Sequence, residues 1–112
     1  MTCVRLVRRT DGRFVSCSAS GHAGYAEHGS DIVCSALTAL LRTTAQVLSE
    51  IDEITVDEQA DVRGQLHFAA DARNADNEVD TCLRYAGRFL EKGLSSLKHE
   101  FPAYIELNIQ RV

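Results

Sequence analysis

The stretch DIVCSALTALLRTTAQVLSE, residues 31 to 50, decides the fold class. Its apolar residues recur at intervals of three and four, which places their side chains on one face of an α-helix. Ser30 or Asp31 can serve as the N-cap of this helix. The apolar face has to be buried against another layer of structure. The apolar positions, continued by the residue just beyond the stretch, are Val33, Leu37, Leu40, Leu41, Leu48 and Ile51.

Strand patterns lie on both sides of this helix. Residues 2–9 and 13–19 alternate apolar and polar side chains around Asp11-Gly12, which predicts an antiparallel hairpin. Residues 53–58 and 65–70 predict a second pair around a polar turn that includes Gly64. A break at Pro102 precedes a last strand, 104–110. The neighbouring layer is therefore expected to be a β-sheet.

A second helix is predicted from about Asn74 to Lys98, with Gly87 and Gly93 tolerated inside it. The predicted order is strand, strand, helix, strand, strand, helix, strand. We expect an α+β fold in which two helices pack on one mixed or antiparallel sheet, because this buries both helical faces. The apolar positions of the second helix are Val79, Leu83, Ala86, Leu90, Leu94 and Leu97.

Composition narrows the class of protein. The chain has 112 residues, of which 45% are hydrophobic and 25% charged, as expected for one domain over residues 1–112. Its net charge of −4 argues against nucleic-acid binding and suits a basic partner. We expect no signal peptide and no membrane span, because no apolar run approaches the roughly 18 to 20 residues that a span requires. Neither a GxGxxG nor a GxxxxGK motif occurs, so no cofactor is expected.

Four cysteines stand at positions 3, 17, 34 and 82, in segments that are predicted to be strands and helices. Without an export signal, reduced thiols in a cytoplasm are expected. Cys3, Cys17 and Cys82 are interpreted as core or interface residues. Cys34 differs from them, because it follows a glycine-rich loop and falls in the first turn of a helix.

The surroundings of Cys34 in the sequence favour a catalytic role for its thiol. The segment SGHAGYAEHGSDIVCSALTAL, residues 20–40, leads from the loop into the helix. The positive end of the helix dipole favours a thiolate. His22 lies just past a predicted strand end and can act as a general base towards the thiol. His28 is the competing base, but it lies further into the loop.

This segment resembles the Prp family of bacterial cysteine proteases, through GHA at 21–23 and GSDIVCSALTAL at 29–40. The resemblance extends more weakly to PAYIEL at 102–107. It implies that His22 and Cys34 are the catalytic pair and that Asp31 is the acidic position of the motif. It also implies a substrate loop that contains Gly21, Ala23, Gly24 and Gly29.

The resemblance implies a cytoplasmic bacterial endopeptidase that forms a homodimer. Family members remove the N-terminal extension from the twenty-seventh large-subunit ribosomal protein. A hydrophobic, Phe-rich segment precedes the bond that they cleave. The expected reaction is attack by the Cys34 thiolate, with His22 as base and then acid, through a thioester acyl-enzyme. The amide of Cys34 and a neighbouring amide can hold the oxyanion. The loop is expected to close over the peptide.

Asp31 has three alternative roles. It can cap the helix, which is the default for an Asp at this position. It can orient His22, as the acidic residue of a hydrolase triad does. As a negative charge near Cys34, it can also raise the thiol pKa.

Two other functions compete with proteolysis. Cys17, His22, His28 and Cys34 have the donor types of a zinc site, but their spacing lacks the close ligand pairs of structural zinc, so no metal is expected. The other alternative is a peptide-binding module or ribosome-assembly factor that uses loop 21–30 as a clamp without catalysis.

Overall fold

The computed structural model describes residues 1–21, 32–60, 64–73 and 76–112. Within these ranges the element order is strand, strand, helix, strand, strand, helix, strand, which confirms the predicted order. Most boundaries differ from the predicted ones by one or two residues, and α2 starts three residues later than expected. The elements are β1 (Thr2–Arg8), β2 (Phe14–Ser20), α1 (Ile32–Ser49), β3 (Ile54–Gln59), β4 (Gln65–Ala72), α2 (Asn77–Glu100) and β5 (Ile105–Arg111).

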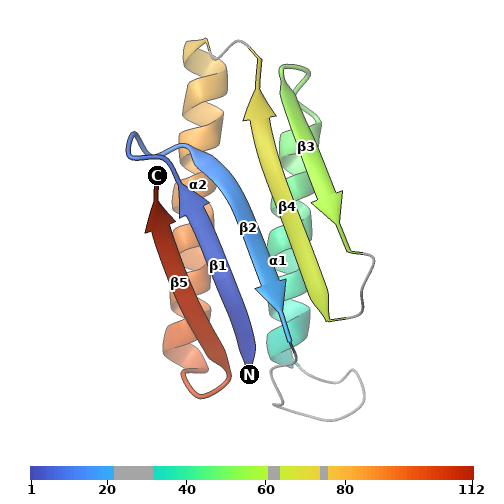
Figure 1. The fold of residues 1–112 in the computed structure, drawn as a ribbon, viewed down its shortest axis with the longest axis vertical. Coiled ribbons are helices and arrows are strands. Elements are labelled where there is room, and N and C mark those ends of the chain that lie inside the picture. The colour runs from blue at the N-terminus through green and yellow to red at the C-terminus, as the bar shows by residue number, and fades with distance from the viewer. Residues whose placement is uncertain (22–31, 61–63, 74–75) are drawn as a thin grey trace.

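The strands of the described residues form one five-stranded mixed sheet in the order β3-β4-β2-β1-β5. β1–β2, β2–β4 and β3–β4 are antiparallel pairs, whereas β1–β5 is a parallel pair. Both α1 and α2 lie on the same face of this sheet (Figure 1). The predicted α+β class is therefore confirmed.

The first hairpin turns where Asp11-Gly12 predicts it. The N–H of Arg9 donates to the carbonyl of Arg13 at 2.8 Å, and the N–H of Gly12 donates to the carbonyl of Arg9 at 2.9 Å. Gly12 has a φ of 99°, as in three-residue hairpin loops that end in a left-handed residue.

The hydrophobic core lies between the sheet and the helices. Alternate strand residues face the helices, and the apolar faces of α1 and α2 meet them. The rings of Phe14 and Phe68 stack with their centroids 4.9 Å apart. The largest fully buried side chains are Phe14, Phe68, Leu6, Leu41, Leu90, Leu94, Ile105, Val4, Val33 and Cys17.

A charged side chain, that of Arg8, is buried on the face of the sheet that meets the helices. Arg8, whose side chain is 10% exposed, donates from Nη1 to Glu91 at 2.9 Å, and from Nε and Nη2 to the carbonyl of Gly12 at 3.1 and 2.9 Å. Arg111 of β5 also contacts Glu91, at 3.2 Å. A Cβ at Gly87 would lie 2.7 Å from Arg8 Nε, so the glycine inside α2 makes room for this guanidinium.

The apolar character of α1 bears on the expectation that the chain has no membrane span. Over Ile32–Ser49 the helix is long and apolar enough to cross a membrane by length and composition alone. The core helix of a soluble protein can meet the same criterion. In this structure its buried residues Val33, Leu37 and Leu41 belong to the core beneath the sheet.

The second helix begins at an acidic cap. Asp76 is the N-cap, and its side chain accepts a hydrogen bond from the N–H of Val79 at 2.9 Å. Asp80, in the first turn, accepts a hydrogen bond from Arg13, the residue before β2, and pairs with Arg84 at 2.8 Å. Negative charges at this end of a helix are favourable, because they complement its dipole.

The pairing of Asp80 predicts a pH dependence of stability. The hydrogen bond from Arg13, aided by the charges of Arg13 and Arg84, holds the pKa of Asp80 below its ordinary value against the opposing effect of desolvation. A lowered folded-state pKa stabilises the fold above the unfolded pKa, about 3.9, and the contribution disappears as pH falls through the folded value. In urea titrations, Asp80→Asn should lower stability at pH 7, and its difference from wild type should shrink below about pH 4. A difference that stays constant down to pH 2 would contradict this assignment.

Candidate active site

Cys34 is the third residue of α1, so its thiol lies in the first helical turn, as predicted. The side chain is partly buried and packs against the hydrophobic core. Its sulfur lies 4.0 Å from the hydroxyl oxygen of Thr2. The backbone amides of a helix start carry partial positive charge, which favours an anion at this position.

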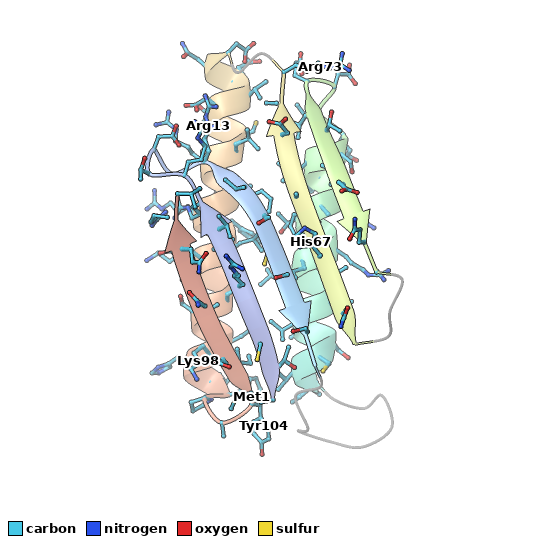
Figure 2. All side chains as sticks on the ribbon, in the orientation of Figure 1. Met1, Arg13, His67, Arg73, Lys98 and Tyr104 are labelled. Atoms are coloured by element: carbon cyan, nitrogen blue, oxygen red, sulfur yellow. The ribbon has the colours of Figure 1, made fainter. Side chains whose placement is uncertain are left out.

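Thr2 is the first residue of β1, and only 3% of it is exposed. Its N–H donates to the carbonyl of Tyr104 at 3.0 Å, and Thr2 is in register with Ile105 of β5. Figure 2 shows Met1 and Tyr104 at the end of the molecule where α1 begins. The nucleophile candidate is therefore packed against the start of the β1–β5 pair.

Gly21 lies directly after β2 and is held at the same end. Its φ is 90°, and its N–H donates to the carbonyl of Gly64 at 2.9 Å. A Cβ at this position would stand 2.8 Å from the carbonyl oxygen of Met1 and 3.9 Å from Thr2 Cα. Gly21, the residue before His22, and Cys34 therefore both lie against the Met1–Thr2 segment.

Of the predicted site residues, the structure describes Gly21 and Cys34. Five others, and with them the alternatives Ser30 and His28, lie outside the described residues, so their roles stay predictions. These five are His22, Ala23, Gly24, Gly29 and Asp31.

The other thiols have different surroundings. Cys17 is fully buried, which confirms it as a core residue, and burial raises its pKa to about 12. Cys3 is exposed on β1, and the pKa of its thiol is raised, mainly by the hydrogen bond that it donates to Glu106 at 3.2 Å. Cys82, on α2, is partly buried, and none of the four cysteines, all within the described ranges, is in a disulfide. Cys17 and Cys3 are therefore poor nucleophiles at neutral pH.

The zinc alternative gains no support from the described residues. Within those ranges, no group of three or more His, Cys, Asp and Glu side chains could hold a metal ion. Cys17, one of the four proposed ligands, is a core thiol with a raised pKa, whereas zinc binds the thiolate.

Comparisons with known protein families and solved structures cover nearly the whole chain. The family model described as cysteine protease Prp matches residues 1–106. The chain belongs to the cysteine protease Prp family. It is thus a cysteine peptidase, a hydrolase, as the segment around Cys34 predicts. The comparison with curated proteins found no match.

Solved structures share the Prp fold over nearly their full lengths. The essential ribosomal processing protease Prp from S. aureus, in complex with a covalently linked product peptide, is 23% identical, with a TM-score of 0.76. The match covers 97% of this chain and 99% of that one. SMU.848 from Streptococcus mutans is 26% identical, with a TM-score of 0.72, and the match covers 100% of this chain and 96% of that one. The S. aureus protease with a substrate peptide is 22% identical, with a TM-score of 0.71 and coverage of 97% and 99%.

The sequence patterns did not single out Thr2, which the structure places beside Cys34. The strand alternation contained a signal for it, because position 2 lies on the same face as Val4 and Leu6, which are both buried. A hydroxyl at an inward position needs a polar partner. The contact with Cys34, 32 positions away, could not be inferred from that signal.

Gly21→Ala is expected to damage the site through the backbone. A φ of 90° is unfavourable for alanine by about 1–2 kcal/mol, and the new Cβ would push the Met1 carbonyl away. We expect lower stability together with slower alkylation of Cys34 by iodoacetamide, read by peptide mass spectrometry. Gly12→Ala is the matched control, because Gly12 has a φ of 99° in the turn that follows the other end of β1. Equal loss of Cys34 reactivity in both variants would contradict a local effect.

Proposed function

We propose that this peptidase removes the N-terminal extension of the twenty-seventh large-subunit ribosomal protein, with Cys34 as nucleophile and His22 as general base. Family membership supports the class of reaction. A relative of the same fold, from S. aureus, is described as a ribosomal processing protease and holds a covalently linked product peptide. The observation that carries the proposal is the position of Cys34, in the first turn of α1 and beside the segment that also contacts Gly21.

The proposed reaction proceeds in two halves. His22 takes the Cys34 proton, and the thiolate attacks the scissile carbonyl to form a C–S bond. His22 returns the proton to the leaving amine as the C–N bond breaks, which leaves a thioester. Water, deprotonated by His22, attacks the thioester, the C–S bond breaks to release the acid, and His22 returns the proton to the Cys34 sulfur. The partial positive charge of amides at the start of α1 favours the oxyanion of each tetrahedral intermediate.

Asp31 has two proposed roles in this scheme, as cap and as orienting residue for His22. Asp31→Asn separates them, because Asn preserves the cap but removes the charge. A cleavage rate that is unchanged in this variant leaves capping as the role. A rate that falls while stability is retained supports orientation of the imidazolium.

Exposed apolar residues near Cys34 support an apolar peptide as substrate. Met1, next to Thr2, is 59% exposed, and Ile32, two residues before Cys34, is 51% exposed. Large exposed apolar side chains next to a catalytic residue suit a hydrophobic peptide segment. The net charge of −4 suits a basic ribosomal protein.

A homodimer is part of the proposal. Tyr85 and Phe89, one helical turn apart on α2, are exposed and supply an apolar area for self-association. Light scattering should give twice the chain mass of 12.3 kDa. A monomer mass at working concentrations would remove this part of the proposal.

Incubation of the purified protein with a peptide that spans the ribosomal extension and its junction tests the function. Mass spectrometry should reveal cleavage at a single bond and a transient enzyme mass increased by the acyl fragment. Binding without cleavage would favour the alternative, a clamp formed by loop 21–30. The clamp alternative also predicts that Cys34→Ser preserves activity in the cell, whereas the protease predicts its loss.

A further inference from the structure

The contact between Thr2 and Cys34 joins a buried hydroxyl to the proposed nucleophile. Thr2 Oγ1 lies 4.0 Å from Cys34 Sγ, and either atom can be the donor. We propose that Thr2 is a positioning residue, whose hydroxyl donates a hydrogen bond to the Cys34 thiolate and thereby stabilises and orients it. This inference rests on the proposed role of Cys34 as nucleophile.

Because Thr2 is buried, its hydroxyl needs a hydrogen-bond partner inside the protein. Thr2 lies on the core face of β1, in line with the buried apolar side chains of Val4 and Leu6. An apolar residue would fill such a position without a polar partner, whereas a buried hydroxyl destabilises the fold unless it is hydrogen-bonded. Among the described residues, no buried side-chain nitrogen or oxygen is left without a partner. The sulfur of Cys34 is a partner within reach of this hydroxyl.

The hydroxyl distinguishes the two protonation states of Cys34. Towards a neutral thiol, the O–H can only make a weak bond with sulfur. Towards a thiolate, it donates to a full negative charge, and such charge-assisted bonds are shorter and about twice as strong. Since the bond favours the charged form, it shifts the thiol–thiolate equilibrium towards the nucleophile.

The backbone around Thr2 holds the hydroxyl in place. Its N–H is bonded to Tyr104, and the strand pairs with β5 on one side and β2 on the other. Threonine is also stiff at χ1, because it is branched at Cβ. The hydroxyl is therefore presented from the sheet to the first turn of α1, and it limits the directions that the sulfur can take.

The pH profile of Cys34 alkylation tests this role. Wild type, Thr2→Val and Thr2→Ser are treated with iodoacetamide between pH 4 and 10, and peptide mass spectrometry follows each thiol separately. Thr2→Val keeps the shape and the strand preference but loses the donor, so the alkylation midpoint of Cys34 should rise by about one pH unit. Thr2→Ser should keep the midpoint near that of wild type. The profile of Cys3, on the opposite face of β1, should not change in any variant.

Defined results overturn the inference. An unchanged Cys34 midpoint in Thr2→Val removes it, as do equal shifts in Thr2→Val and Thr2→Ser. If Thr2→Val does not fold, Thr2→Ala is compared with Thr2→Ser in the same way, because both shorten the side chain and only serine retains the donor.

Alkylation needs no peptide, so the result is independent of the proposed substrate. A shifted midpoint without cleavage of the ribosomal peptide by wild type would support the role of Thr2 and reject that substrate. Cleavage by wild type without a shifted midpoint would do the reverse. When both hold, Thr2→Val should lower kcat about tenfold well below its midpoint and leave KM unchanged.

Discussion

Cys34→Ala should abolish cleavage of the ribosomal peptide and leave the fold intact. Removal of a catalytic nucleophile lowers kcat on the order of a millionfold in a well-studied hydrolase, which is below detection in a peptide assay. Cys34 is only partly buried at the edge of the core, so loss of its sulfur should lower stability by about 1 kcal/mol or less. Chromatography of the peptide over time measures cleavage, and thermal unfolding measures the fold.

His22→Ala should have a comparable effect, because base and nucleophile act as a unit. The double variant should then be no worse than either single variant. Cys82→Ala is the matched control, since Cys82 is another partly buried helical thiol, and it should retain full activity. Cleavage that persists in Cys34→Ala and disappears in Cys82→Ala would overturn the assignment of the nucleophile.

Arg8→Ala should lower the stability of the fold more than Asp80→Asn or Arg5→Ala does. The change removes the hydrogen bonds to Gly12 and Glu91 and leaves a cavity beside Gly87. Breaking a buried ion pair typically costs about 3–5 kcal/mol, and the partial exposure of Glu91 places the expected loss near 3 kcal/mol. Urea unfolding monitored by circular dichroism measures it.

Two further variants make the Arg8 result specific. Arg8→Lys keeps the charge but not the planar fork, so it should recover only part of the stability. Arg5→Ala removes an exposed arginine of the same strand, which is bonded to Gln110 at 2.6 Å, and should cost less than about 1 kcal/mol. Equal losses in Arg8→Ala and Arg5→Ala would contradict the structural role of the buried network.

The order and type of elements followed from local patterns. Helical spacing in 31–50 and alternation in 2–9 each describe a short segment, and the Asp11-Gly12 turn is encoded in two residues. The sheet order was beyond these patterns, because the pairing of β1 with β5 depends on contacts between opposite ends of the sequence. The apolar spacing predicts α2 from about Asn74, whereas the N-cap at Asp76 marks its observed start.

The sequence predicts the position of some site residues but not the contacts that surround them. The place of Cys34 in a first helical turn followed from the stretch itself. The need for glycine at position 21 could not be seen from sequence, because it arises from a positive φ and from the nearby Met1 carbonyl. Arg8 lies on the same face of β1 as the buried Val4 and Leu6, so its burial could be inferred from strand alternation. The partners that compensate for this burial come from α2 and the hairpin turn, and they could not be inferred in this way.

The parallel β1–β5 pair can form only late in the synthesis of the chain. The β1–β2 and β3–β4 hairpins join neighbouring segments, so they can form early, whereas β1 can meet β5 only after residues 105–111 have been synthesised. Thr2, which contacts Cys34, is tied to Tyr104 and paired with Ile105. We therefore expect this peptidase to complete the surroundings of Cys34 only after β5 has left the ribosome, so that an unfinished copy would be inactive.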